Sequence, residues 1–248
     1  MIRGLDHFKT FFRPYAGNFI LVGGVASYLL LDEAGAAKVR PTKDLDIVLI
    51  MKPSDDFFKA LKDYIKLGAY EIQRGKKEQA TFYRFQKPQD EQFPIMIELF
   101  SAAQTGLELF EGQHIIPITE SEGALSLSAI LLDDEYYAII RNNAVEKDGI
   151  YIINQMALIP FKAKAYLEIK DRGEDSKNWK KHRGDIINLA VSFLSEEIQE
   201  KLTGKVRDHF VKFMNQLKQE ITSDIIEGAC NQKIPKETVI RLLESTFL

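Results

Sequence analysis

The sequence predicts an α+β protein, with an α/β-type N-terminal domain built on a mixed sheet and a helical C-terminal domain. Short apolar runs with strand character alternate with helical stretches up to about residue 150, and the remainder is a series of helical stretches. Glycine is dense in the first half of the chain and sparse in the last. Because these changes coincide, we place the domains at residues 1–150 and 151–248.

The N-terminal part opens on a strand, a tight turn and a helix. Residues 18–22 (NFILV) are a short apolar run that ends at two glycines, and the sequence VASYLLL after them has helical character. Residues 44–51 (DLDIVLIM) predict a second strand, buried on both faces because its apolar run is continuous. Ser54 is the expected N-cap of a helix that stops at Gly68.

Further strands are expected before the helical part begins. Residues 69–73 and 80–86 predict a hairpin around the polar turn GKKE, and residues 94–100 (PIMIELF) predict a strand that carries Glu98. Additional strand character occurs at residues 113–118, 130–131, 136–140 and 150–153.

The C-terminal part predicts a set of helices. Pro160 within the first of them predicts a kink or a late start, and Pro235 suits the first turn of the last one. A polar loop is expected at residues 171–178. The predicted helices are residues 154–170, 181–194, 196–221, 223–229 and 235–247.

The composition restricts the class of protein. Of 248 residues, 45% are hydrophobic and 28% are charged, which suits a globular chain and excludes a disordered one. The net charge of −3 disfavours a broadly basic surface for nucleic acid. A single cysteine, Cys230, excludes a disulfide framework and favours the reducing cytoplasm. We find neither a signal-peptide pattern nor a run of about 20 apolar residues, so we expect a cytoplasmic protein without a membrane partner.

Three features have the residue types that phosphate chemistry needs. Gly23 and Gly24 let a backbone approach a phosphate beside the free amides of a helix N-terminus; an ordinary turn is the alternative. Asp44 and Asp46 occupy positions i and i+2 of a strand, so their carboxylates share one face and suit Mg²⁺; the alternative is a solvated strand end. Glu98 completes a three-carboxylate cluster if its strand lies beside theirs, and otherwise faces water.

Taken together, these motifs resemble the polymerase-beta-like nucleotidyltransferase superfamily. The family's pattern is an apolar residue, Gly, Gly or Ser, a spacer, Asp-x-Asp and a third carboxylate downstream. The Arg-x-Thr-x-Asp-x-Asp string resembles the AbiEii branch, which contains type IV toxin–antitoxin toxins and abortive-infection nucleotidyltransferases. The spacer here is longer than usual, so residues 32–39 are expected to form a local insertion. The matching residues are Val22, Gly23, Gly24, Arg40, Thr42, Asp44, Asp46 and Glu98.

The resemblance implies an enzyme that moves a nucleoside monophosphate from a nucleoside triphosphate to an acceptor hydroxyl, with two Mg²⁺ ions. By the resemblance, Asp44 and Asp46 bind both ions. Glu98, a longer acid than the usual Asp, binds the ion on the acceptor side and helps to deprotonate the acceptor. Gly23 and Gly24 cradle the β- and γ-phosphates.

The resemblance also implies roles for residues outside this core. Lys162, or Lys164 in the other register, contacts the triphosphate from the helical domain, unless it is a surface lysine. Asp185, expected at the start of a helix, orients Lys162 or the nucleotide, unless it only complements the helix dipole. Further phosphate contacts, with a structural or solvated role as the alternative, are implied for Ser27, Arg40 and Lys43.

The motifs leave the acceptor open. A toxin-like enzyme would modify tRNA or another RNA and would have an antitoxin partner; the basic stretch around Trp179 would contact RNA, unless it is a solvated loop. An antibiotic-modifying enzyme would take a cationic small molecule, which the acidic residues 133–135 suit weakly. A non-catalytic nucleotide-binding partner protein is the third alternative, and the three retained acids disfavour it.

Overall fold

The structure is a computed structural model that describes residues 2–50, 53–72, 84–102, 115–117 and 128–248. Its contacts divide the chain into two compact units. We call Met1–Val25 together with Pro41–Ile153 the sheet unit, and Ala26–Arg40 together with Asn154–Leu248 the helical unit.

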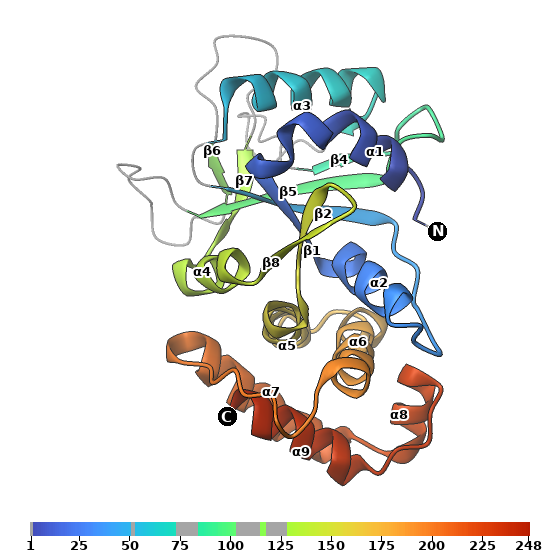
Figure 1. Cartoon of the computed structure of the whole chain (residues 1–248), viewed down its shortest axis with the longest axis vertical. Helices are drawn as coiled ribbons and strands as arrows, with labels where there is room; N and C mark the ends of the chain where they lie inside the picture. The colour runs from blue at the N-terminus through green and yellow to red at the C-terminus, as the bar shows by residue number, and fades with distance from the viewer. Residues whose placement is uncertain (1, 51–52, 73–83, 103–114, 118–127) are drawn as a thin grey trace. The chain divides into compact units, whose positions relative to one another are not determined.

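The predicted α+β class with a mixed sheet is confirmed (Figure 1). The sequence predicts two continuous domains, 1–150 and 151–248, whereas the contacts group residues 26–40 with the helical unit. The boundary between the units falls within helix α2 (Gly23–Glu33). Residues 32–39 were expected to form a local insertion. They comprise the last two residues of α2 and part of the chain that connects α2 to β2.

The sheet unit is built on one mixed sheet. The strands of its described residues are β1 Phe19–Val22, β2 Asp44–Leu49, β3 Glu71–Ile72, β4 Arg84–Gln86, β5 Met96–Ala102, β6 Ile115–Pro117, β7 Ser128–Leu132, β8 Ala144–Lys147 and β9 Ile150–Ile153. Their order is β3-β4-β5-β2-β1-β9-β8, and β7 pairs with β5 and β6. The pairs β2–β5, β1–β9 and β5–β7 are parallel, and the others are antiparallel. This order places β2 and β5 side by side in the interior of the sheet.

The strands follow most of the sequence predictions. The hairpin is present as β3 and β4, and its GKKE turn lies outside the described residues. The strand character at residues 130–131 belongs to β7, and residues 150–153 form β9. Within the described residues, the structure confirms the strands predicted at residues 18–22, 44–51, 94–100 and 113–118.

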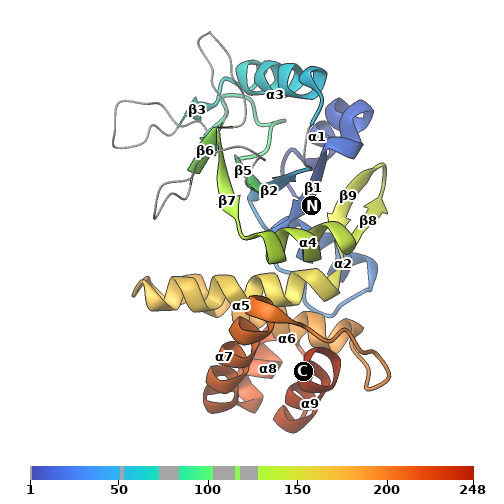
Figure 2. The same cartoon turned by 90° about the vertical axis from the view of Figure 1, so that its left-hand side faces the viewer.

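Two helices cover one face of the sheet (Figures 1 and 2), and aromatic side chains pack between them and the sheet. Helix α1 (Leu5–Phe12), the 3-10 turn η1 (Arg13–Asn18) and helix α3 (Asp55–Leu67) contribute to this layer. The rings of Phe12 and Tyr64 lie 5.0 Å apart between centroids, and both are fully buried. Burying such rings is a main source of stability for the sheet unit.

Helix α3 begins and ends where the sequence predicts. The Ser54 side chain accepts a hydrogen bond from the Phe57 backbone N–H at 3.2 Å, which satisfies one of the free amides of the first turn. At the other end, the Gly68 N–H donates to the Tyr64 carbonyl at 3.0 Å.

Residues 136–140 are helical, so the strand character assigned to them is wrong. They lie in helix α4 (Asp134–Asn142), where Tyr136, Tyr137 and Ile140 are buried. The Asp133 side chain accepts from the Glu135 N–H at 3.0 Å and caps the helix. The acidic cap and helical spacing of the buried residues therefore outweigh the β-propensity of the tyrosines and isoleucines.

The helical unit consists, beyond its part of α2, of five described helices. Helices α5 and α6 pack against one another, α7 packs on α5, and α8 and α9 pack on α6. None of the helices formed by the described residues is long and apolar enough to span a bilayer. Their bounds are α5 Gln155–Asp171, α6 Ser176–Phe193, α7 Gly204–Glu220, α8 Ser223–Cys230 and α9 Lys236–Phe247.

The helix ends differ from the prediction in four places. Of the two alternatives expected from Pro160, the late start is wrong: helix α5 begins at Gln155, close to the start predicted at residue 154, because the Asn154 side chain caps it by accepting from the Met156 N–H at 2.9 Å. Asp175 caps α6 early, which shortens the expected loop at residues 171–178. Pro235 is the N-cap of α9 and precedes its first turn.

The fourth difference is residues 196–203, which are not helical. Their backbone bonds to the end of α9: the Glu200 N–H donates to the Thr246 carbonyl at 2.8 Å, and the Leu202 N–H donates to the Phe247 carbonyl at 3.1 Å. These non-local hydrogen bonds replace those of a helix, and the sequence carries no sign of them.

Candidate active site

The paired acids of the Asp-x-Asp motif lie at the start of β2. Asp44 and Asp46 are half-buried, while Leu45 between them is fully buried, so the two acids share one face of the sheet. Across the parallel pairing with β5, Asp46 lies opposite Glu98. The strand that carries Glu98 therefore lies beside the strand that carries Asp46, which is the arrangement that a cluster of these acids requires.

The glycine turn allows Asp46 to approach the backbone. Across the antiparallel pairing with β1, Asp46 lies opposite Val22, which precedes the turn. Gly23 has a φ of 65°, and a Cβ added there would lie 1.9 Å from Asp46 Oδ2. A Cβ added at Gly24 would lie 2.4 Å from Thr42 Oγ1. Both glycines are thus needed for two side chains of the Arg-x-Thr-x-Asp-x-Asp string to pack on the turn.

Gly23→Ala is expected to lower the free energy of unfolding by about 1–3 kcal/mol and to displace Asp46. Urea unfolding followed by circular dichroism measures the first effect. Gly35→Ala is the matched control, because Gly35 also has a positive φ, 62°, but open space around its Cβ position. If the two variants lose equal stability, steric contact with Asp46 contributes nothing.

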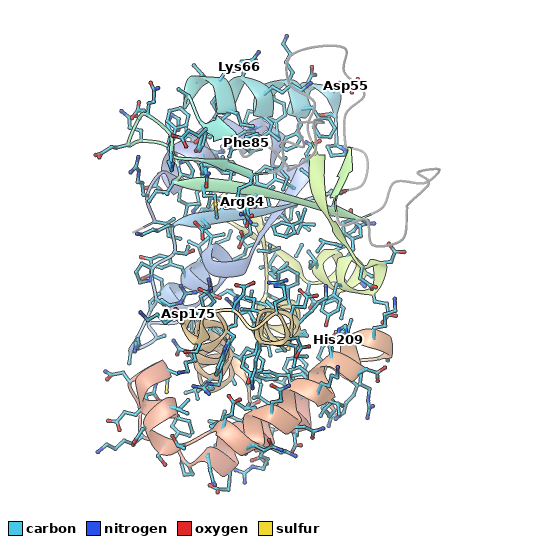
Figure 3. All side chains as sticks on the ribbon, turned by 180° about the vertical axis from the view of Figure 1, so that it is seen from behind. Asp55, Lys66, Arg84, Phe85, Asp175 and His209 are labelled. Atoms are coloured by element: carbon cyan, nitrogen blue, oxygen red, sulfur yellow. The ribbon has the colours of Figure 1, made fainter. Side chains whose placement is uncertain are left out.

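On the side away from β2, Glu98 forms an ion pair with an arginine of β4. Arg84 of β4 lies opposite Glu98 across the antiparallel β4–β5 pairing, and its Nε donates to Glu98 Oε1 in an ion pair. Arg84 and Phe85 point to opposite faces of the sheet (Figure 3). Sequence reasoning missed Arg84, although a charged residue that alternates with an apolar one on a strand is a signal for a polar face.

The acids fit Mg²⁺ in part. Carboxylate oxygens are the ligands that Mg²⁺ prefers, and Asp44 with Asp46 supplies two such groups on one face. Within the described part of the chain, no three His, Cys, Asp or Glu side chains are grouped so that they could hold a metal ion. Asp44 and Asp46 are therefore the two candidate ligands that share a face, and Glu98 is in an ion pair with Arg84.

A second group of predicted residues meets in the helical unit. Lys162 of α5 donates to Asp185 Oδ2 at 2.6 Å, and only 2% of its surface is exposed. Arg40 binds the same carboxylate with two hydrogen bonds, at 2.8 Å from Nη2 and 3.1 Å from Nε. Burial opposes ionisation of Asp185, but the charges and hydrogen bonds of Lys162 and Arg40 hold its pKa well below the ordinary value.

Asp185 lies in the middle of α6 and not at a helix start, so that part of the prediction is wrong. Of the two lysines offered by the motif, Lys162 binds Asp185, whereas the half-buried Lys164 forms an ion pair with Glu168 on its own helix. Arg40, for which the resemblance implies a phosphate contact, forms an ion pair with Asp185. Two cations on one carboxylate leave this cluster with a net positive charge.

His182 lies one helical turn before Asp185, and its Nδ1 is buried without a hydrogen-bond partner. Burial and the nearby charges of Lys162 and Lys181 lower the pKa of His182 to about 3, although Asp185 acts in the opposite direction. The folded chain therefore keeps this imidazole neutral at pH values where an unfolded histidine takes a proton.

Because the folded pKa of His182 is below the unfolded one, protonation of the unfolded chain should destabilise the fold as the pH falls from about 6.5 toward 3. We expect a slope of up to about 1.4 kcal/mol per pH unit from this residue. His182→Asn should remove that slope in unfolding measured between pH 7 and 5, and the half-exposed His209→Asn should leave it in place. An unchanged slope in His182→Asn contradicts the prediction.

The remaining predicted residues are not part of these two groups. Ser27 is buried in α2 and Lys43 is exposed. In the basic stretch, Lys170 and Arg183 form ion pairs with Glu220, and Lys170, Lys180 and Arg183 lie over the Trp179 ring. Part of the basic stretch therefore stabilises the packing of α5, α6 and α7.

Comparisons with known proteins give weak likenesses. The chain matches no protein-family model and no curated protein. A nucleotidyltransferase-like antigenic protein from Paracoccidioides brasiliensis is similar in structure, with a TM-score of 0.43 and 12% identity over 96% of this chain and 99% of that one. The polyadenylate synthase of Megavirus has a TM-score of 0.38 and 13% identity over 87% of this chain and 36% of that one. At these TM-scores the likeness carries no weight for function, which must be inferred from the residues of this chain.

Proposed function

We propose that the protein is a Mg²⁺-dependent nucleotidyltransferase of the polymerase-beta-like superfamily. The observation that supports this best is the packing of Asp46 on the Gly23 turn and opposite Glu98. A strand–Gly-Gly–helix turn with Asp46 packed against it places a carboxylate beside the N-terminus of helix α2, and transfer of a nucleotide requires both an oxygen ligand for the metal ion and a site for phosphate.

In the proposed reaction, an acceptor hydroxyl oxygen attacks the α-phosphorus of a nucleoside triphosphate. The new O–P bond forms while the bond to the β-phosphate breaks, and pyrophosphate leaves with the electron pair. Bound Mg²⁺, held by Asp44 and Asp46, would supply charge neutralisation on the phosphates. Gly23 and Gly24 would present backbone amides to the triphosphate, and Glu98 would accept the acceptor proton.

For the acceptor we propose RNA, in an AbiEii-like, toxin-type enzyme with an antitoxin partner. The Arg40-x-Thr42-x-Asp44-x-Asp46 string supports this branch, and Thr42 packs on Gly24 as a motif residue should. The buried ion pair of Lys162 and Asp185 supports a role for the helical unit in holding a cation for phosphate. A cationic antibiotic is the competing acceptor.

The test is transfer of label from each α-labelled nucleoside triphosphate, with Mg²⁺, to total RNA or to a panel of aminoglycosides. We expect labelled RNA with one nucleotide and no labelled aminoglycoside. Calorimetry with the same nucleotide checks binding directly. If no triphosphate binds in the presence of Mg²⁺, the proposed function is wrong.

The Arg84–Glu98 ion pair favours one other function, a non-catalytic nucleotide-binding partner protein. In that case the role of Glu98 is to stabilise the pairing of β4 and β5 through its ion pair with Arg84. Such a protein would be stabilised thermally by Mg²⁺ and nucleotide but would transfer no label to any acceptor. Comparing the melting temperature with transfer in one preparation separates the two functions.

A further inference from the structure

Part of the basic stretch around Trp179 forms one exposed face of a helix. The sequence predicts a polar loop at residues 171–178, but α6 begins within that range. The exposed residues at helical positions i, i+3 and i+4 near the start of α6 are Lys177, Lys180 and Lys181, which we call the lysine face. A helix fixes the relative positions of these three side chains on the surface, whereas a loop would leave them open.

Two of the three acids in residues 170–183 are bound to groups outside the side chains of the lysine face. Glu174 forms an ion pair with Arg172 at 2.8 Å, and the Asp175 carboxylate accepts from the backbone N–H of Lys177 at 2.9 Å. Within the part of the chain that the structure describes, no carboxylate forms an ion pair with a side chain of the lysine face. The lysine face therefore presents three positive charges that the described fold does not neutralise.

Trp179 adds an aromatic ring among these cations. It is the only tryptophan of the chain, and it is half-buried. The centroid of its ring lies 5.0 Å from Lys170 Nζ, 5.5 Å from Lys180 Nζ and 5.5 Å from Arg183 Cζ. Lys170 and Arg183 both donate to Glu220, so these two cations are anchored in the helical unit. The ring attracts Lys180 without cancelling its charge, because a cation–π contact involves no opposite ion.

We propose that the lysine face and Trp179 bind the phosphate backbone of the RNA acceptor. A nucleic-acid strand carries a regular row of negative charges, which neighbouring lysines at fixed positions can neutralise. Basic side chains beside an aromatic ring are the combination with which proteins bind single-stranded nucleic acid, and this favours RNA over an acidic polypeptide. The inference rests on the proposed RNA acceptor and assigns the docking of that acceptor to the helical unit.

The experiment is a fluorescence-anisotropy titration of a labelled single-stranded RNA with the full chain, at several salt concentrations. A triple variant of the lysine face, with glutamine at all three positions, should bind this RNA about tenfold or more weakly at low salt. The slope of log K against log salt should become smaller by about 2, because each contact to a single strand contributes about 0.7. The matched control changes the net charge equally through three exposed lysines elsewhere in the helical unit and should bind as the wild type does: Lys212→Gln, Lys233→Gln and Lys236→Gln.

Trp179 provides a second readout, since the emission of the only tryptophan reports binding at this surface directly. RNA should change this emission in the wild type and in the control variant. At the same RNA concentration, the lysine-face variant should show little change, although its urea unfolding should match that of the wild type because the substituted side chains are exposed. An unlabelled acidic polypeptide, polyglutamate, is added as a competitor and should displace RNA poorly.

The outcomes separate this inference from the proposed function. If the lysine-face variant binds RNA as the wild type does, the inference is wrong, even where transfer of label to RNA supports the proposed function. Equal weakening in both triple variants also overturns it, because net charge alone would then explain the loss. If polyglutamate displaces RNA as well as unlabelled RNA does, the surface fits an acidic polypeptide and the RNA assignment fails. If the lysine face binds RNA as expected but no nucleotide is transferred to it, the proposed function fails and the surface stands.

Discussion

Asp44→Asn is expected to abolish transfer of labelled nucleotide, with a loss of about 10³-fold or more in rate. The substitution keeps the shape of the side chain but removes one negative charge and weakens an oxygen ligand for Mg²⁺. Since Asp44 is only half-buried and starts β2, the free energy of unfolding should change little. Transfer to the acceptor identified for the wild type, measured beside urea unfolding, tests both halves of this prediction.

Asp63→Asn provides the matched control, because Asp63 is an exposed acid of α3 in the same unit. It should transfer label at the wild-type rate. An Asp44→Asn enzyme that retains more than about a tenth of wild-type activity would show that this carboxylate is not a metal ligand in the reaction. Because Asp63→Asn changes the net charge by the same amount, it shows whether the net charge alone affects the rate of transfer.

Local signals explain which parts of the fold could be predicted. Ser54 caps α3 and Gly68 ends it, because a cap needs only residues close in sequence. Residues 196–203 have a helical composition, yet their hydrogen bonds go to the end of α9, which lies more than forty positions further along the chain. Non-local pairing of this kind leaves no pattern in one sequence.

The same distinction holds for the candidate site. The two-residue period of a strand places Asp44 and Asp46 on one face, and this could be predicted before the strand order was known. The ion pair of Arg84 with Glu98 depends on the register of two strands joined through a long connection. Register is set by the whole sheet, so the partner of Glu98 could only come from the structure.

The contacts of Arg40 show how a motif residue can serve a different unit from its neighbours. It lies four positions before Asp44, but contacts group it with α5 and α6 in the helical unit. The Arg-x-Thr-x-Asp-x-Asp string therefore spans the boundary between the two units. Thr42, Asp44 and Asp46 belong to the sheet unit, while the arginine neutralises Asp185.

Lys162→Met is expected to lower the free energy of unfolding by about 3–5 kcal/mol. The methionine fits the space of the lysine stem, but Asp185 loses the shorter of its two cation contacts while it remains buried. Lys164→Met is the matched control on the same helix, because its ion pair with the exposed Glu168 lies one turn away on the helix surface and should contribute about 0.3–0.5 kcal/mol. Urea unfolding of the two variants thus shows which of the two lysines stabilises the buried Asp185.

The wild type and Lys162→Met should differ in their free energies of unfolding, and the pH dependence of this difference shows whether the charge of Lys162 causes it. The folded pKa of Asp185 is held below its unfolded value of about 3.9, so the ion pair stabilises the fold fully above that pH. As the pH falls from about 4 toward the lower folded pKa, Asp185 takes up a proton and the contribution is lost. The gap between wild type and Lys162→Met should therefore be constant from pH 7 to 5 and shrink in more acidic solution. A gap that stays the same at pH 3 would mean that Lys162 acts through packing of its stem, because packing does not depend on the charge of Asp185.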